Sequence, residues 1–238
     1  MIEVSIVLPA YNEAARLEDT VRRTIDAVGK STDSFEIVIA EDGSSDGTDK
    51  IAAALTEAYP CVQHLHSDER LGRGAALNRA LKHSEGEVMA YIDVDLATEM
   101  SYLRDLIDAV RVEGFDFATG SRMMPESDVE RPFKRSIASK GFNLFTRTLL
   151  HSRLYDHQCG FKSFRRGPLF ELIDDIEDEH WFWDTELLVL AQQRGYGVKE
   201  FPVIWKHGGA TATKVNIVRD VFGMGRQILR MWWRHAYR

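Results

Sequence analysis

Cysteine is scarce in this chain, which has only two residues of this type, Cys61 and Cys159, among 238. The two lie far apart, belong to different motifs and match no metal-ligand spacing. Such sparse usage suits a reducing compartment, and we therefore expect a cytoplasmic location.

Long apolar runs and an excess of positive charge are also missing, and we expect no leader segment. No uninterrupted apolar run reaches the about 18 residues that a membrane-spanning helix needs. Met1 leads directly into a strand-like run, Ile2 to Leu8, without the basic segment and cleavage site of a signal peptide. The formal net charge of -7 argues against a nucleic-acid partner, which would require a basic footprint.

The glycine-rich turn of dinucleotide-binding proteins is absent as well. A Rossmann domain would carry G-x-G-x-x-G directly after the first strand, where this chain has PAYNEA, residues 9–14. A nucleotidyltransferase of similar sheet order would usually have a Gly-rich, basic loop at the same place. The first loop therefore disfavours both classes, and the nucleotidyltransferase is kept only as an alternative.

The chain does contain a regular alternation of strand-like and helix-like segments. Its length and its 44% hydrophobic content allow one sizeable core, which predicts a single α/β domain. Apolar runs predict strands at residues 4–8, 35–40, 61–66, 88–92 and 115–120. Helical spacing predicts helices at 12–28, up to about 59, at 75–83 and at 102–112. Helices between successive strands are typical of a mostly parallel sheet with helices on both faces.

The alternation stops after residue 120. Residues 121–134 are the longest stretch without predicted structure, a charged loop that is a candidate lid. We then expect helices at about 135–150 and 183–195, a strand at 198–205 and a terminal amphipathic helix at 213–238.

Two carboxylates follow the apolar strand 88–92. That strand can be buried on both faces, whereas Asp93 and Asp95 cannot. Because alternate side chains of a strand point the same way, these carboxylates converge on the crevice at the carboxyl edge of the sheet. A hard divalent cation with oxygen ligands would relieve their repulsion. The alternative is a polar turn with Asp95 near a helix N-terminus.

Four motifs occur in a characteristic order: PAYNE (9–13), EDGSSDGT (41–48), GRGAALNRAL (72–81) and DVDLAT (93–98). This half of the chain resembles the nucleotide-sugar-binding half of the inverting glycosyltransferases of family 2, which have the GT-A fold. The segments GSR (120–122), KRSIASKGFN (134–143), DHQCGFKSF (156–164), WDTEL (183–187) and TKVN (213–216) look like the dolichyl-phosphate hexose synthases of that family. The resemblance implies a donor half at 1–98, an acceptor half at 99–212 and a terminal helix at 213–238.

The resemblance also implies roles for single residues. Those expected around the nucleotide sugar are Pro9, Tyr11, Glu13, Glu41, Asp42, Gly72, Arg73, Gly74, Asp93, Val94 and Asp95. Among them Asp42 would accept a hydrogen bond from the base, Gly72 to Gly74 would let the backbone approach the donor, and Asp93 and Asp95 would bind Mg²⁺ or Mn²⁺. The acceptor phosphate would be held by Arg122, Arg135 and Lys214, and the catalytic residues would be Asp93, Asp95 and Arg122.

The donor stays open between a UDP-hexose and a GDP-hexose. Glu41 stands where many family members have Asp, a change of one methylene. Ala97 stands where mannose-type synthases often have a Gln that adds a metal ligand. DLAT and the WFWDTEL segment look more like the glucose-type branch.

The expected acceptor is dolichyl or another polyprenyl phosphate. Hexose transfer places negative charge on the leaving diphosphate, which a metal on Asp95 stabilises. A phosphate monoester has a second pKa of about 6 and is ionised at pH 7, so cations that position it suffice. A sugar hydroxyl, the nearest rival, would need a carboxylate base, for which Asp156 and Asp184 are candidates. A non-catalytic nucleotide-sugar sensor is a further alternative.

Several of these residues have structural alternatives. Arg122 can cap a strand or pair with Glu126, Arg135 can belong to a solvated helix face, and Lys214 can simply open the terminal helix. Three carboxylates are equally compatible with helix caps and ion pairs: Asp156, Asp184 and Glu186. Three histidines share no metal-ligand spacing and are expected to be structural: His157, His180 and His207.

The terminal helix is amphipathic. One face carries Arg219, Arg226, Arg230 and Arg234, and the apolar side carries Ile217, Val218, Val221, Phe222, Ile228, Leu229, Trp232 and Trp233. The apolar side can pack on the domain, or the helix can lie on anionic lipid with its tryptophans at headgroup level. The second interpretation predicts a peripheral protein at the cytoplasmic face of the membrane.

Overall fold

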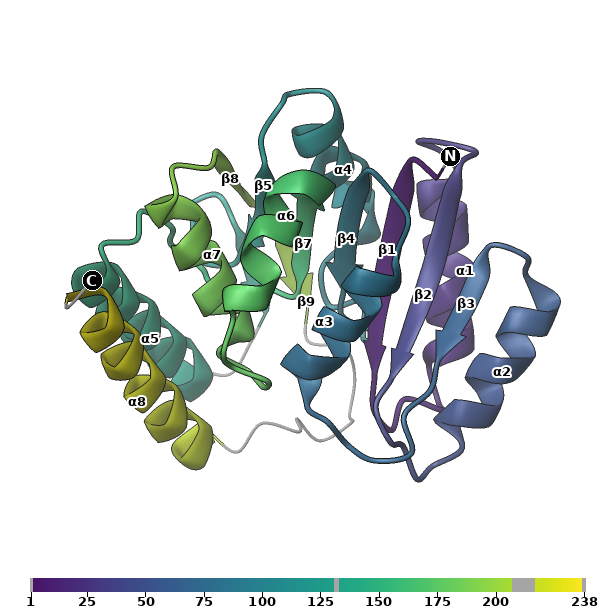
Figure 1. Ribbon diagram of the computed structural model, residues 1–238, viewed down its shortest axis with the longest axis horizontal. Helices are drawn as coiled ribbons and strands as arrows, with labels where there is room; N and C mark the ends of the chain where they lie inside the picture. Colours follow the sequence, from purple (N-terminus) through teal and green to yellow (C-terminus); the bar gives the residue numbers. More distant parts are fainter. Residues whose placement is uncertain (1, 131–132, 207–216, 237–238) are drawn as a thin grey trace.

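The computed structural model describes residues 2–130, 133–206 and 217–236 (Figure 1). Seven strands of the described residues form one sheet in the order β3-β2-β1-β4-β7-β5-β8. These are β1 (Val4–Ala10), β2 (Phe35–Glu41), β3 (Val62–Leu65), β4 (Val88–Ile92), β5 (Phe117–Ser121), β7 (Phe161–Arg165) and β8 (Val198–Pro202). Two short strands, β6 (Asp128–Glu130) and β9 (Ile204–Lys206), pair separately.

Helices cover both faces of the sheet, as the alternation predicts (Figure 1). They are α1 (Leu17–Val28), α2 (Thr48–Ala58), α3 (Arg73–His83), α4 (Leu103–Arg111), α5 (Phe133–Leu150), α6 (Arg166–Leu172), α7 (Trp183–Gln193) and α8 (Ile217–Ala236), with single 3-10 turns η1 (Met100–Tyr102) and η2 (Ile173–Asp175). Because strand side chains alternate, Ile6 and Leu8 of β1 enter the core under α1, α2 and α4, whereas Val7 enters the core under α3, α6 and α7. The predicted α/β domain is confirmed.

The sheet is mostly parallel, with β7 as the exception. β7 lies between β4 and β5 and runs antiparallel to both, while β5 pairs with β8 in parallel. The segment DHQCGFKSF was not predicted as a strand, because a short mixed run such as FKSFR has neither clear alternation nor a continuous apolar stretch. β7 joins the two halves of the chain in one sheet.

Three predicted segments differ from the structure: one helix start, one loop and one strand. The first helix begins at Leu17 and not at residue 12, because Asn12 adopts a left-handed φ of 53° and the backbone N–H groups of Glu13 and Ala14 donate to Thr48 and Asp46. The loop 121–134 is not structureless, since it contains β6 and the start of α5. The strand 198–205 is divided at Val203, and β9 then leaves the main sheet to pair with β6.

Helices α5 and α8 lie side by side at one end of the molecule (Figure 1). Ile228 and Met231 of α8 are fully buried, so the terminal helix does pack on the domain. Among the described residues, no helix is both long enough and apolar enough to cross a bilayer.

Candidate active site

The paired carboxylates lie where the sequence predicts them, directly after β4. The backbone N–H of Asp93 donates to the carbonyl of Gly160 at 3.0 Å. A Cβ atom at Gly160 would lie 1.8 Å from the Asp93 carboxylate, so only glycine fits there. Asp93, Asp95, Thr98, Gly160 and Trp205 are among the residues that line a hollow at this edge of the sheet. The carboxylates are therefore accessible, and β7 shapes their surroundings.

The surroundings of Asp95 disfavour its negative charge, which a bound cation would stabilise. Burial raises the pKa of Asp95, and the negative charge of Asp93 raises it further. Its carboxylate accepts a hydrogen bond from the Ala97 N–H at 3.1 Å, and the intervening Leu96 is in the left-handed region at a φ of 45°. Non-glycine residues with such backbone strain occur preferentially at functional sites. Two close carboxylates, of which Asp95 has a raised pKa, are a donor set for a hard divalent ion.

The loops after β1 and β2 are joined into one unit at the same edge. The Asn12 N–H donates to the Ser44 hydroxyl at 3.0 Å, and the Ser45 N–H donates to the Asn12 side chain at 2.8 Å. Glu13 and its partner Arg16, 3.1 Å apart, act electrostatically on Asp95. The PAYNE and EDGSSDGT motifs thus come together beside the paired carboxylates.

Glu41 and Asp42 support this edge through backbone contacts. Both oxygens of the buried Asp42 carboxylate accept hydrogen bonds, from the N–H groups of Leu71 at 2.7 Å and Gly72 at 3.0 Å. Glu41 accepts from the Ser44 N–H and contacts His66. Asp42 therefore holds the next loop in place, and its predicted hydrogen bond to the base stays a prediction.

Close packing against the segment before α7 explains why positions 72 and 74 are glycines. A Cβ at Gly72 would lie 2.2 Å from the His180 ring, and one at Gly74 would lie 2.8 Å from the Asp178 carbonyl. The segment that leads into α7 thus occupies the space beside them, and their predicted approach to the donor stays untested. On the other side of this loop, the Arg70 guanidinium lies 3.9 Å from the centre of the Tyr11 ring.

Arg73 joins the two halves of the site. Its guanidinium donates to Asp93 at 2.8 Å and to Asp184 of α7 at 2.7 Å. Asp184 also accepts a hydrogen bond from Tyr91 and lies 3.2 Å from the fully buried Lys162. Burial alone would raise the pKa of Asp184, but the charges of Lys162 and Arg73 lower it below its usual value. Asp184 is therefore a buried, ionised partner of two cations.

Arg122 is held in the same way by Asp156. The Nε and Nη2 atoms of Arg122 donate to the Asp156 carboxylate at 2.7 and 3.0 Å, and the Arg122 backbone N–H adds a third bond at 3.0 Å. Burial would raise the pKa of Asp156, yet the charge of Arg122 holds it well below its usual value. The Arg122 guanidinium lies 5.9 Å from the centre of the Trp205 ring, and Trp205 lines the hollow beside Asp93, so this cation lies at the edge of the same site. The alternative partner Glu126 is not the one observed.

Comparison with known proteins agrees with the motifs. Residues 5–172 match the model of glycosyl transferase family 2. The chain belongs to glycosyl transferase family 2. It is 50% identical over 239 residues to glycosyltransferase AglD of Haloferax volcanii, a match that covers 100% of this chain but 38% of AglD. It is 30% identical over 247 residues to a dolichyl-phosphate beta-glucosyltransferase of Dictyostelium discoideum, covering 98% of this chain and 75% of that protein. The predicted resemblance is confirmed.

Solved structures agree on the fold of this family 2 chain. Glucosyl-3-phosphoglycerate synthase from Mycobacterium tuberculosis in complex with UDP aligns with a TM-score of 0.68 at 20% identity, over 97% of this chain and 79% of that one. A complex of the same synthase with Mn²⁺, UDP and glucosyl-3-phosphoglycerate aligns with a TM-score of 0.67 at 20% identity, over 96% of this chain and 77% of that one. The GT-A-like fold is confirmed.

Other predicted residues of the family 2 chain have different positions. Val94 is buried and its carbonyl accepts the Thr20 hydroxyl, so its side chain is part of the core. Pro9 is a β1 residue in register with Ala40. His157 is structural, since it contacts Asn143 and Ser152 and burial lowers its pKa to about 4. Four predicted residues fall outside the described residues or side chains: Arg135, His207, Lys214 and Arg219.

Sequence reasoning missed Tyr91, Gly160 and Lys162 as site residues of this family 2 chain. Tyr91 looks like an ordinary apolar strand residue, and Gly160 becomes necessary only where β7 approaches Asp93. Lys162, a charged residue within the run FKSF, carried the one usable signal, because a lysine is almost never fully buried unless it is paired.

Proposed function

We propose that this chain transfers a hexose, with inversion, from a nucleotide sugar to the phosphate of a polyprenyl lipid such as dolichyl phosphate. The dolichyl-phosphate beta-glucosyltransferases among its relatives support this acceptor and favour glucose. The UDP complexes of the structural neighbour make UDP-glucose the first donor to test. The reaction would take place at the cytoplasmic face of a membrane, in keeping with two free cysteines.

The observation that carries the proposal is the state of the two candidate bases. A sugar hydroxyl acceptor needs a carboxylate that can take its proton. Asp156 is paired with Arg122, and Asp184 is paired with Arg73 and Lys162. Both carboxyl groups have a lowered pKa, and both are fully or almost fully buried. Carboxylates in this state are poor proton acceptors for an incoming hydroxyl. A phosphate monoester needs no such base, because it is already ionised.

The residues that would hold the metal are Asp93 and Asp95. Their oxygen donors and the raised pKa of Asp95 fit Mg²⁺ or Mn²⁺. When bound, such an ion stabilises the negative charge of the leaving diphosphate. Arg73, which donates to Asp93, holds that carboxylate in place from the α3 side. Mn²⁺ is present in complexes of the structural neighbour with UDP.

Of the three cations proposed for the acceptor phosphate, Arg122 is the one whose side chain the structure describes. Its Nε and Nη2 atoms are used by Asp156, and Nη1 is not part of that pair. Asp156 thus fixes the direction of the guanidinium, which is an ordered donor for a phosphate oxygen. Arg135 and Lys214 remain part of the proposal from the motifs alone.

The first prediction is the transfer reaction itself. We expect purified protein with Mg²⁺ or Mn²⁺ to convert dolichyl phosphate to a lipid-linked sugar from UDP-glucose, and chelation of the metal to stop the reaction. GDP-mannose and other UDP-hexoses are the comparison donors, and a free sugar is the comparison acceptor. Turnover of a nucleotide sugar onto the free sugar, but not onto dolichyl phosphate, would overturn the proposal. Binding of donors without any turnover would favour the sensor alternative.

Membrane contact is a further part of the proposal, and the structure changes how it would occur. Two arginines of the predicted basic stripe face carboxylates of the domain: Arg230 contacts Glu177 at 3.0 Å, and Arg234 contacts Glu177 and Glu186. The Arg234 side chain is 27% exposed and belongs to the packing of α8, whereas the Arg230 side chain is 62% exposed, so a lipid-facing role of the stripe stays a prediction. The neighbouring helices α5 and α8 instead expose large apolar side chains, namely Ile137, Leu144, Phe145, Leu229, Trp232 and Trp233.

The second prediction is that lipid binding depends on these apolar residues more than on charge. We expect the protein to co-sediment with liposomes, and the double variant Trp232→Ser with Trp233→Ser to lose most of this binding, because interfacial tryptophans anchor proteins at headgroup level. Arg226→Gln should have a smaller effect, about 1 kcal/mol for one basic residue near an anionic surface. Val112→Ser, at an exposed apolar site on α4's end, is the control. Unchanged sedimentation of the tryptophan variant would contradict this part.

A further inference from the structure

A second group of metal-ligating side chains lies away from the paired aspartates. Glu41 at the end of β2, His64 of β3 and His66 just beyond β3 each place one donor atom within 4.8 Å of the others. β3 is the edge strand of the sheet, three strand positions from β4 (Figure 1). At the usual strand spacing, His64 on β3 is about 14 Å from β4 and Glu41 on β2 is about 10 Å from it, so the two groups are separate sites.

The pairing of β2 with β3 brings these donors together. Ile39 is opposite His64 and Ala40 is opposite Leu65, so the next position sets Glu41 beside His66. Because side chains alternate, His64, His66 and Glu41 point to one face of the sheet. Arg79 of α3 ties the two strand ends together, since its guanidinium donates to the carbonyls of Glu41 and His66. The backbone that carries the three donors is therefore held in place.

His66 is oriented as metal-ligating histidines commonly are. His66 Nδ1 lies 2.6 Å from the Glu41 carboxylate, and its Nε2 lies 3.3 Å from the Asp68 carboxylate. A carboxylate on the far nitrogen is the usual arrangement that orients a ligating imidazole. The Nε2 of His64 is buried and has no hydrogen-bond partner within the described part of the chain. A buried polar atom without a partner is costly and calls for an explanation such as an ion.

We propose that Glu41, His64 and His66 bind one divalent ion of the zinc class. Two imidazoles and a carboxylate are the donors that Zn²⁺ accepts, with a fourth position left for water, whereas Mg²⁺ and Mn²⁺ prefer oxygen donors. The chain then separates two kinds of metal, a hard ion at Asp93 and Asp95 and a borderline ion at this site. Glu41 also accepts the Ser44 N–H, so the ion stabilises the turn that follows β2 and carries Asp42.

Binding of Zn²⁺ in the presence of excess Mg²⁺ tests this site without reference to enzymatic activity. We expect calorimetry to give about one equivalent of Zn²⁺ for the wild type, Co²⁺ to give a tetrahedral absorption spectrum, and Zn²⁺ to raise the melting temperature. His64→Gln and His66→Gln should each lose all three signals, and Asp68→Asn should weaken binding by about tenfold. Asp95→Asn should retain them, because it alters only the other site.

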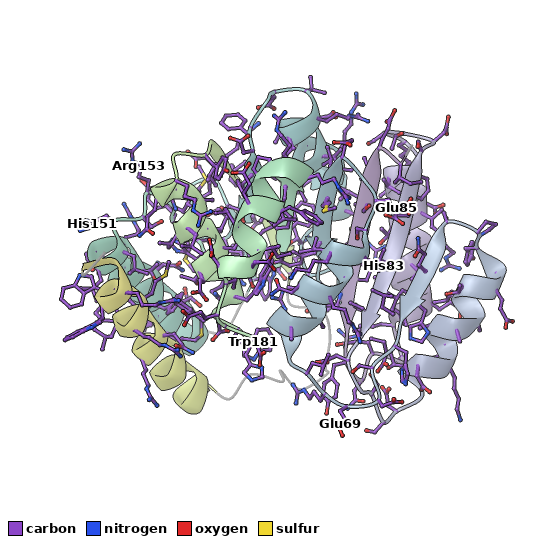
Figure 2. The ribbon with its side chains drawn as sticks, viewed as in Figure 1. Glu69, His83, Glu85, His151, Arg153 and Trp181 are labelled. Carbon is purple, nitrogen blue, oxygen red and sulfur yellow. The ribbon has the colours of Figure 1, made fainter. Side chains whose placement is uncertain are left out.

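The control is His151→Asn, which changes an exposed histidine far from β3 (Figure 2). Asparagine tolerates the left-handed φ of 54° found there. Melting temperatures without Zn²⁺ establish that the variants are folded. Zn²⁺ binding that survives both His64→Gln and His66→Gln would overturn the proposal, as would a folded wild type that binds no Zn²⁺.

Discussion

Asp95→Asn is expected to reduce metal-dependent turnover by about 10²–10³-fold, the usual cost of removing one group that stabilises transition-state charge. A neutral amide is a poor ligand for a hard divalent cation. The fold should persist, since the substitution removes a charge that is both buried and close to Asp93, and these two effects raise the pKa of Asp95. The measurement is kcat as a function of Mg²⁺ or Mn²⁺ concentration, together with urea unfolding of both proteins.

The matched control for Asp95→Asn is Asp105→Asn, which makes the same chemical change at an exposed position on α4. It should leave both turnover and metal dependence unchanged. Full activity of Asp95→Asn at limiting metal would contradict the assignment of the metal to Asp93 and Asp95.

Arg122→Ala is expected to lower the free energy of unfolding by about 3–5 kcal/mol, because it leaves the Asp156 carboxylate as an uncompensated buried charge. The loss should depend on pH. In the wild type the folded-state pKa of Asp156 lies below its unfolded value, so the stability from this pair is present above about pH 4 and is lost as the pH falls. The difference between wild type and variant should therefore shrink in acid, which urea unfolding at several pH values would measure.

A control at the surface and a rescue variant make this test specific. Arg194→Ala removes an exposed pair with Asp175 and should cost less than about 1 kcal/mol. The double variant Arg122→Met with Asp156→Asn should regain most of the stability, because it leaves no uncompensated buried charge and keeps a side-chain oxygen for the Arg122 backbone N–H. A loss in Arg122→Ala no larger than in Arg194→Ala would contradict a buried pair.

The same double variant also separates the contribution of Arg122 to stability from its contribution to acceptor binding. If Arg122 holds the acceptor phosphate, the KM for dolichyl phosphate should rise by about 10- to 100-fold, as expected from a lost charged hydrogen bond, while the KM for the donor changes little. A double variant that is stable and has a normal KM for the acceptor would show that Arg122 serves only the fold.

Much of the structure of residues 1–98 could be predicted from the sequence, because its signals are local. Apolar runs that end in Glu41, Asp42, Asp93 and Asp95 predict strands and their polar ends, and a parallel sheet brings such ends to one edge. Helix starts were less predictable. The shift of the first helix to Leu17 depends on Asp46 and Thr48, more than thirty residues away, which hold the preceding backbone N–H groups.

Residues 99–212 were less predictable because their contacts are distant in sequence. Lys162 on β7 contacts Asp184 on α7, and Arg122 contacts Asp156, which is 34 residues away in the sequence. Neither pair is visible as a motif, so the sequence left Asp156 and Asp184 open as bases, caps or ion-pair partners. The fates of Arg230 and Arg234 likewise depend on where Glu177 and Glu186 lie.

The sequence by itself determined the class of fold, the order of the motifs and the position of the Asp93 and Asp95 pair, since strand periodicity and apolar content act over a few neighbouring residues. Only the tertiary structure decided which charges are neutralised. Burial changes the free energy of a charge by several kcal/mol and therefore demands a partner, and that partner is supplied by chain folding rather than by sequence proximity. For this protein the ion pairs of Asp156 and Asp184 argue against either residue as a base, which supports the proposal of an acceptor that is already ionised.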